Sequence, residues 1–131
     1  MPQPRAIVPD NGGIRAGLNS TGSDIAKYRI MKKVNTAVDA ITPATNGTAV
    51  IYGVTMQPIT NGFAGDVQVE GRAIVEASAA IAIGANVTAT TGGKAVTAGA
   101  AAHILGVAAS ASAADGELIE VDIIRSITPA A

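Results

Sequence analysis

The stretch that decides the fold reads DVQVEGRAIVEA and covers residues 66–77. Polar and apolar side chains alternate along it with Ile74 as the exception, and the apolar set is Val67, Val69, Ala73, Val75 and Ala77. A period of two residues is typical of a strand that buries one face and exposes the other. Because the stretch is long for one strand, we expect a bend at Gly71.

The composition extends this β prediction to the whole chain. Fifteen isoleucines and 12 valines stand against three leucines among the 131 residues. Branching at Cβ suits a pleated, half-buried surface, whereas leucine is favoured in helices. Short apolar runs at near-regular spacing therefore predict an all-β fold, either a small β-barrel or a jelly-roll-like sandwich, with about eight short strands.

Turn residues separate the predicted strands. Gly92-Gly93 lies between the candidates 85–90 and 94–98, and glycine supplies the two positive φ angles that a tight hairpin needs. Asp115-Gly116 gives a second turn signal before the last candidate strand, 117–124. The other candidate strands are residues 25–34, 37–42, 48–57 and 103–109.

The first 24 residues differ from the rest of the chain. They contain three prolines and four glycines and show no sustained period. We expect an extended N-terminal arm over residues 1–24 and a single β domain over residues 25–131. A disordered tail is the alternative for the arm, although Ile7, Val8, Ile14 and Leu18 favour an arm that docks on another surface.

The residue types that carry chemistry are scarce. The chain has no cysteine and one histidine, His103, which lies in an apolar run and is expected in the core or at an interface. No pair of carboxylates has a spacing that suggests acid–base work. We therefore expect no enzyme activity, no cofactor and no metal site.

Charge and hydropathy exclude two further classes of partner. The net charge of −1 does not fit a general nucleic-acid binder, so no nucleic acid is expected as a partner. The longest apolar run, residues 79–85, is too short to cross a bilayer, and the proline-rich N-terminus lacks the pattern of a signal peptide. No membrane partner is expected.

Lys94 suggests one alternative function. It stands beside the Gly92-Gly93 turn, as the modified lysine does in biotinyl and lipoyl carrier domains, which are small β-sandwiches. Its neighbours Gly93 and Ala95 differ from the usual surroundings of that lysine. A plain surface lysine and a small β ligand-binding module remain open, and the three aromatic residues argue against sugar binding.

The second half of the chain carries a family resemblance. Its motifs are FAGD at 63–66, the strand at 67–77, IGANV at 83–87, HILGVA at 103–108 and DGELIEVD at 115–122. Their order is similar to that of the tailed-bacteriophage capsid decoration, or cement, proteins. These motifs consist largely of turn glycines and core positions.

The resemblance implies a structural protein on the outer surface of the virion. Such proteins bind the mature head shell through the major capsid protein and stabilise it, often as homotrimers and sometimes as dimers. The chain would then be made in the host cytoplasm. As capsid contacts we predict two sets of residues, Pro2, Gln3, Pro4, Arg5, Ile7 and Val8 of the arm and the basic residues Lys27, Arg29, Lys32 and Lys33. A solvated face is the ordinary reading of the basic set.

Overall fold

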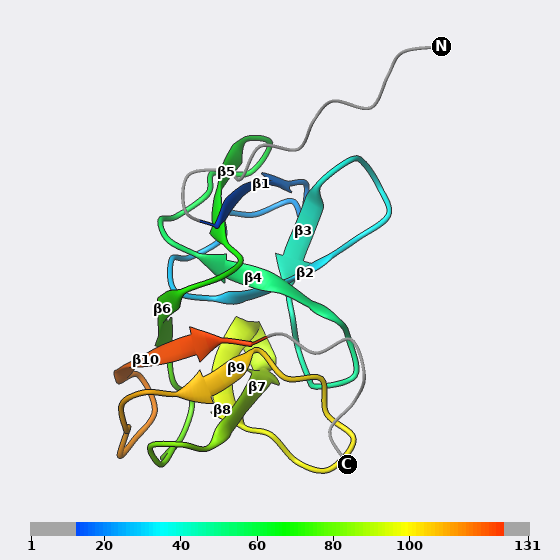
Figure 1. Ribbon diagram of the computed structural model, residues 1–131. Coiled ribbons are helices and arrows are strands. Elements are labelled where there is room, and N and C mark those ends of the chain that lie inside the picture. The colour runs from blue at the N-terminus through cyan, green and yellow to red at the C-terminus, as the bar shows by residue number, and fades with distance from the viewer. Residues whose placement is uncertain (1–12, 125–131) are drawn as a thin grey trace.

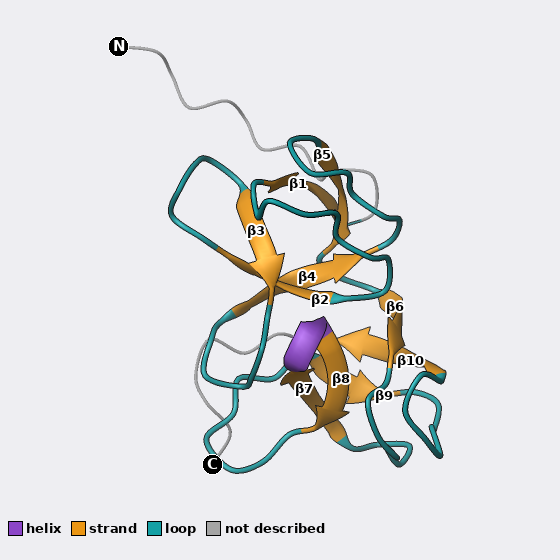
Figure 2. Cartoon of the chain, turned by 180° about the vertical axis from the view of Figure 1, so that it is seen from behind, coloured by secondary structure: helices purple, strands orange, loops and turns teal. Residues whose placement is uncertain are grey.

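The computed structural model describes residues 13–124, and this part of the chain is all-β. It contains ten strands and one short 3-10 turn, η1 (Thr91–Gly93). The strands form a closed five-stranded barrel and a second five-stranded sheet, which lie one above the other in both views (Figures 1 and 2). The structure confirms the all-β prediction. Of the two expected architectures, a small β-barrel and a jelly-roll-like sandwich, it contains the barrel.

The barrel uses the first half of the described chain. Its strands are β1 (Ile14–Asn19), β2 (Ile30–Lys33), β3 (Ala40–Pro43), β4 (Ile51–Thr55) and β5 (Ala64–Gln68). They follow the order β1-β3-β2-β4-β5 around the barrel, and β5 closes it by pairing antiparallel with β1. β1 pairs parallel with β3, and the other pairs are antiparallel.

The second sheet uses the other half. Its strands are β6 (Arg72–Glu76), β7 (Asn86–Thr90), β8 (Lys94–Thr97), β9 (Gly106–Ala108) and β10 (Leu118–Ile123), in the order β6-β10-β9-β7-β8. Its two edge strands meet just beyond β6, where Ala77 forms a bridge with Ala95 of β8. Ser78 donates from its backbone N–H and its hydroxyl to the Ala95 carbonyl, so the sheet curls almost into a second barrel.

Gly71 marks the boundary between the two sheets. Its φ of 84° lies in the region that favours glycine, and it separates β5 of the barrel from β6 of the second sheet. The predicted bend is confirmed, and the alternation is confirmed as well. Val67, Val69, Ala73, Val75 and Ala77 are all buried, and Ile74 is exposed.

β4 is buried on both faces because it lies between two apolar clusters. Ile51 and Val54 pack with residues of the second sheet, while Tyr52 belongs to the cluster inside the barrel. The pairing with β2 skips one residue, since Met31 lies opposite Gly53 and Lys32 lies opposite Ile51. Tyr52 is therefore the extra residue of a β-bulge, which turns its side chain to the other cluster.

The Gly92-Gly93 turn joins β7 to β8 as predicted. Both glycines have positive φ, at 75° and 78°. A Cβ on Gly93 would lie 2.7 Å from the Ile30 carbonyl oxygen, so the turn rests directly on β2 of the barrel. The glycine thus serves both the hairpin and the junction of the two sheets.

Three expectations are corrected. Residues 14–19, expected in an extended arm, form β1 of the barrel, and residues 1–12 lie outside the described part of the chain. The strand expected over 25–34 begins at Ile30, because Tyr28 has a φ of 62°. The strand expected over 37–42 begins at Ala40, since Asp39 also has a positive φ. Among the described residues, no helix is long and apolar enough to cross a membrane.

Candidate interaction surface

The four basic residues predicted as contacts do not share one face. Lys27 is exposed, and its Nζ lies 5.0 Å from the centre of the Tyr28 ring. Arg29 is largely buried and points to the second sheet, where it contacts Glu76. Lys32 and Lys33 line a groove on the barrel. The structure therefore brings Lys32 and Lys33 together in one groove, whereas Lys27 and Arg29 lie outside its lining.

The groove that Lys32 and Lys33 line has a volume of about 500 Å³ and is open to solvent. It lies where the start of β1, the end of β2 and the start of β4 come together. Its described lining contains three basic side chains and no acidic one, with Arg15, Lys32, Lys33, Ala49, Val50, Ile51 and Tyr52 as its residues. The volume falls within the range of pockets that hold small ligands or a few side chains.

Polar contacts hold the wall of this groove in place. The Tyr52 hydroxyl donates to the Ala16 carbonyl of β1 at 3.0 Å. Lys33 Nζ lies 5.0 Å from the centre of the Tyr52 ring and 3.9 Å from Asp39 Oδ1. Within residues 13–124, neither Arg15 nor Lys32 forms an ion pair, so the groove keeps a positive charge.

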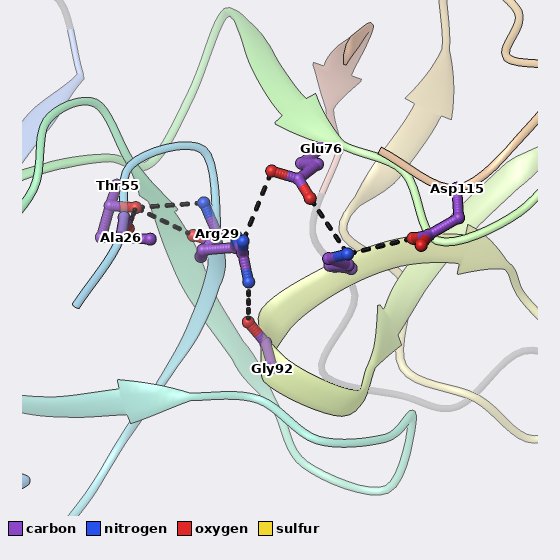
Figure 3. Close-up of polar contacts among 7 residues, drawn as sticks. Ala26, Arg29, Thr55, Glu76, Gly92 and Asp115 are labelled. Atoms are coloured by element: carbon purple, nitrogen blue, oxygen red, sulfur yellow. Dashed lines mark hydrogen bonds and ion pairs between the residues drawn. The ribbon is translucent and has the colours of Figure 1, made fainter. Parts of the chain in front are cut away.

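A separate ionic cluster joins the barrel to the second sheet (Figure 3). Arg29 donates to the Gly92 carbonyl at 3.1 Å and to Glu76 Oε1 at 3.3 Å. The other Glu76 oxygen lies 3.0 Å from Lys94 Nζ. Glu76 thus links a residue just before β2 to the first residue of β8, and the cluster fixes the two sheets relative to each other.

Lys94 belongs to this cluster and not to an open turn tip. Its Nζ also lies 3.0 Å from Asp115 Oδ1, and its side chain is 24% exposed. The hydrogen bonds to Asp115 and then to Glu76 raise the pKa of Lys94 above its ordinary value. An amine held protonated by two carboxylates is a poor nucleophile, so this geometry does not favour the carrier-domain alternative.

His103 is buried, as expected, and lies in the irregular segment just before β9. Its carbonyl accepts a hydrogen bond of 2.6 Å from the Thr88 hydroxyl, and its backbone N–H donates to the Gly47 carbonyl. The two bonds attach the backbone of His103 to β7 and to the loop between β3 and β4. In the described part of the chain, no three His, Cys, Asp or Glu side chains gather as a metal site.

The predicted contacts of the arm, Pro2, Gln3, Pro4, Arg5, Ile7 and Val8, lie outside the described residues. Sequence reasoning missed Arg15, Val50 and Tyr52 as parts of a basic groove. The sequence assigns Arg15 to the expected arm, although its alternation with Ile14 and Ala16 is compatible with a strand. The bulge that turns Tyr52 has no sequence signal of its own.

Comparison with known proteins assigns the fold and the family. A family model described as phage cement protein matches residues 23–123. No curated protein matches the chain. The structure is similar to that of the head fiber gp8.5 N base in bacteriophage phi29, with a TM-score of 0.70 and 22% sequence identity over 86% of this chain and 94% of that chain. This second likeness shows a shared fold.

Proposed function

The chain belongs to the phage cement protein family and is a structural protein of the phage capsid, and on that premise we propose that it binds the outer surface of the mature shell and stabilises it. The observation that carries the proposal is the family match, which runs from just before Ile25 to the end of β10. We propose no catalytic role. The protein would be made in the host cytoplasm and would reach its place when the head matures.

The proposed partner is the major capsid protein of the head. A shell offers many equivalent sites, so a modest affinity at each site is enough when several copies act together. The two sheets share an apolar cluster and an ionic cluster, which support a rigid body that can brace the shell. A homotrimer is the favoured assembly and a dimer is the alternative.

Two parts of the chain are proposed to contact the shell. One is the segment with Pro2, Gln3, Pro4, Arg5, Ile7 and Val8, which would order on binding at an entropic cost that the contacts offset. The other is the basic set. Lys27, Lys32 and Lys33 have side chains open to a partner, whereas Arg29 is engaged by Glu76 and Gly92.

Light scattering after size-exclusion chromatography tests the proposal, with the chain alone and after mixing with mature heads that lack it. The proposal expects a trimer, or a dimer, that elutes with the heads. A chain that elutes apart from heads at every concentration would reject capsid binding. A monomer that still elutes with heads would reject only the assembly.

A further inference from the structure

We propose that the groove of Arg15, Lys32, Lys33, Val50 and Tyr52 binds an acidic, extended segment of the capsid protein. The inference rests on the proposed function, because that function supplies the partner. The proposed site keeps Lys32 and Lys33 of the basic set and adds Arg15, which lines the same groove. The partner is defined by its chemistry, as a segment with at least two carboxylates and one apolar side chain.

Charge complementarity is the first support for this occupant. Three cations line the groove without a carboxylate among the described lining residues, although the chain as a whole carries 10 acidic and nine basic residues. Within residues 13–124, Arg15 and Lys32 have no ion-pair partner, whereas Lys33 Nζ lies 3.9 Å from Asp39 Oδ1. An arginine fork pairs well with a carboxylate, and the lysines add charge without fixed geometry.

The apolar part of the lining is the second support. Val50 is 47% exposed and adjoins Ala49 and Ile51, so the groove offers a small apolar area beside its charges. An extended segment presents alternate side chains to one side. Two carboxylates and one apolar side chain at alternate positions would therefore face the cations and Val50 together.

A nucleic acid fits the groove less well. Single strands bind to aromatic faces on which bases stack. The Tyr52 side chain is part of the barrel cluster, its hydroxyl is bound to Ala16, and Lys33 lies over its ring. Tyr52 is 8% exposed, so its ring offers no stacking platform. The net charge of −1 also gives no general attraction to phosphates.

The chain's own first residues are also a poor match in charge. Residues 1–12 contain one carboxylate side chain, Asp10, and one basic side chain, Arg5. An acidic segment of another protein complements the three cations better. Contacts of residues 2–8 with Val50 in NMR spectra of the free full-length protein would overturn the proposal, because they would show the groove already occupied.

Binding of full-length variants to mature heads is the main test. Lys32→Gln and Arg15→Gln should each weaken binding about fivefold, and the double variant should bind with a flatter salt dependence between about 50 and 300 mM salt. Arg72→Gln removes the same charge from an exposed arginine of β6, which lies outside the groove lining and outside the proposed capsid contacts, and should change binding less than about twofold. Equal losses in Arg72→Gln and Lys32→Gln, or no loss in Lys32→Gln, would overturn the proposal.

A second measurement separates this inference from the proposed function. The ¹⁵N-labelled chain is titrated with a peptide that carries glutamate, glutamate and leucine at alternate positions, and with the same peptide carrying glutamines. The proposal expects shifts at Arg15, Lys32 and Val50 with the glutamate peptide and not with the glutamine peptide. No shift there, or larger shifts with single-stranded DNA, would overturn the groove assignment. Failure of the wild-type chain to bind heads while the peptide shifts appear would reject capsid binding alone.

Discussion

Replacing Gly106 with alanine should destabilise the protein strongly, because the backbone of β10 lies against this glycine. Gly106 begins β9, where it pairs with Val87 of β7 and Ile123 of β10. A Cβ built on it would lie 1.9 Å from the Asp122 carbonyl oxygen and 2.9 Å from the Ile124 nitrogen. Both are backbone atoms, so no side chain can turn aside to make room.

The size of the effect follows from this geometry. Ordinary van der Waals contact of a Cβ begins near 3.4 Å, so β9 and β10 would have to separate by about 1.5 Å. The hydrogen bond from Ile124 N to the Leu105 carbonyl, now 2.9 Å long, cannot survive such a shift, nor can the adjoining ladder. Two lost hydrogen bonds and strained packing cost about 3–5 kcal/mol. For a domain of this length Tm should fall by about 10–18 °C.

Gly99→Ala is the matched control. A Cβ on Gly99 meets no atom within 4 Å, and the φ of this residue is not in the positive region. The change should leave stability unaltered or raise it by up to about 1 kcal/mol, because alanine restricts the unfolded chain. Urea unfolding followed by far-UV circular dichroism, at one protein concentration, measures both variants. A Gly106→Ala protein with the wild-type midpoint would refute the close approach of β9 and β10.

Three further variants test the junction and the ionic contacts. Ile30→Ala should lower the free energy of unfolding by about 3–4 kcal/mol, since Ile30 is fully buried in the cluster shared by both sheets; a loss below about 1 kcal/mol in urea unfolding would contradict that shared core. Glu76→Gln should lower the urea midpoint at neutral pH more than Asp122→Asn does, because the Glu76 pairs are the more buried; the reverse order would contradict the role of Glu76 as the link between sheets. The hydrogen bond from Arg72 lowers the pKa of Asp122, so its stabilising contribution is present above about pH 4 and is lost as pH falls through the lowered pKa. The difference in urea midpoint between wild type and Asp122→Asn should therefore shrink between about pH 5 and pH 2, and a constant difference would contradict the pairing.

Local patterns predict the individual strands of the second sheet well, because the signals for these strands are short-range. Each signal lies within a few residues of the element that it predicts. The alternation in residues 66–77 predicts a half-buried strand, the glycines at 92 and 93 predict the β7–β8 turn, and the apolar run from residue 103 predicts β9. Gly71 shows the limit of such signals. Its bend was predicted, but the sequence does not say that the bend divides two sheets, since the partners of β5 and β6 lie far away in the chain.

Long-range contacts explain what the sequence did not predict. β1 lies in a stretch rich in glycine and proline, and its place in the barrel comes from pairing with β3 and β5. The basic groove needs Arg15 from β1 and Tyr52 from β4, which the barrel brings together through the bulge of β4. The sequence predicts that the basic residues at 27–33 share one face of a strand. The positive φ at Tyr28 interrupts that strand, and the Arg29 side chain instead forms an ion pair with Glu76.

The most direct test of the central claim is the stability of mature heads with and without this protein. Heads that lack the chain are heated with increasing amounts of it, and DNA release is followed with a dye that heads exclude. A structural cement protein should raise the release temperature until its sites are filled, and it should sediment with the heads. Unchanged release together with no sedimentation would contradict the claim.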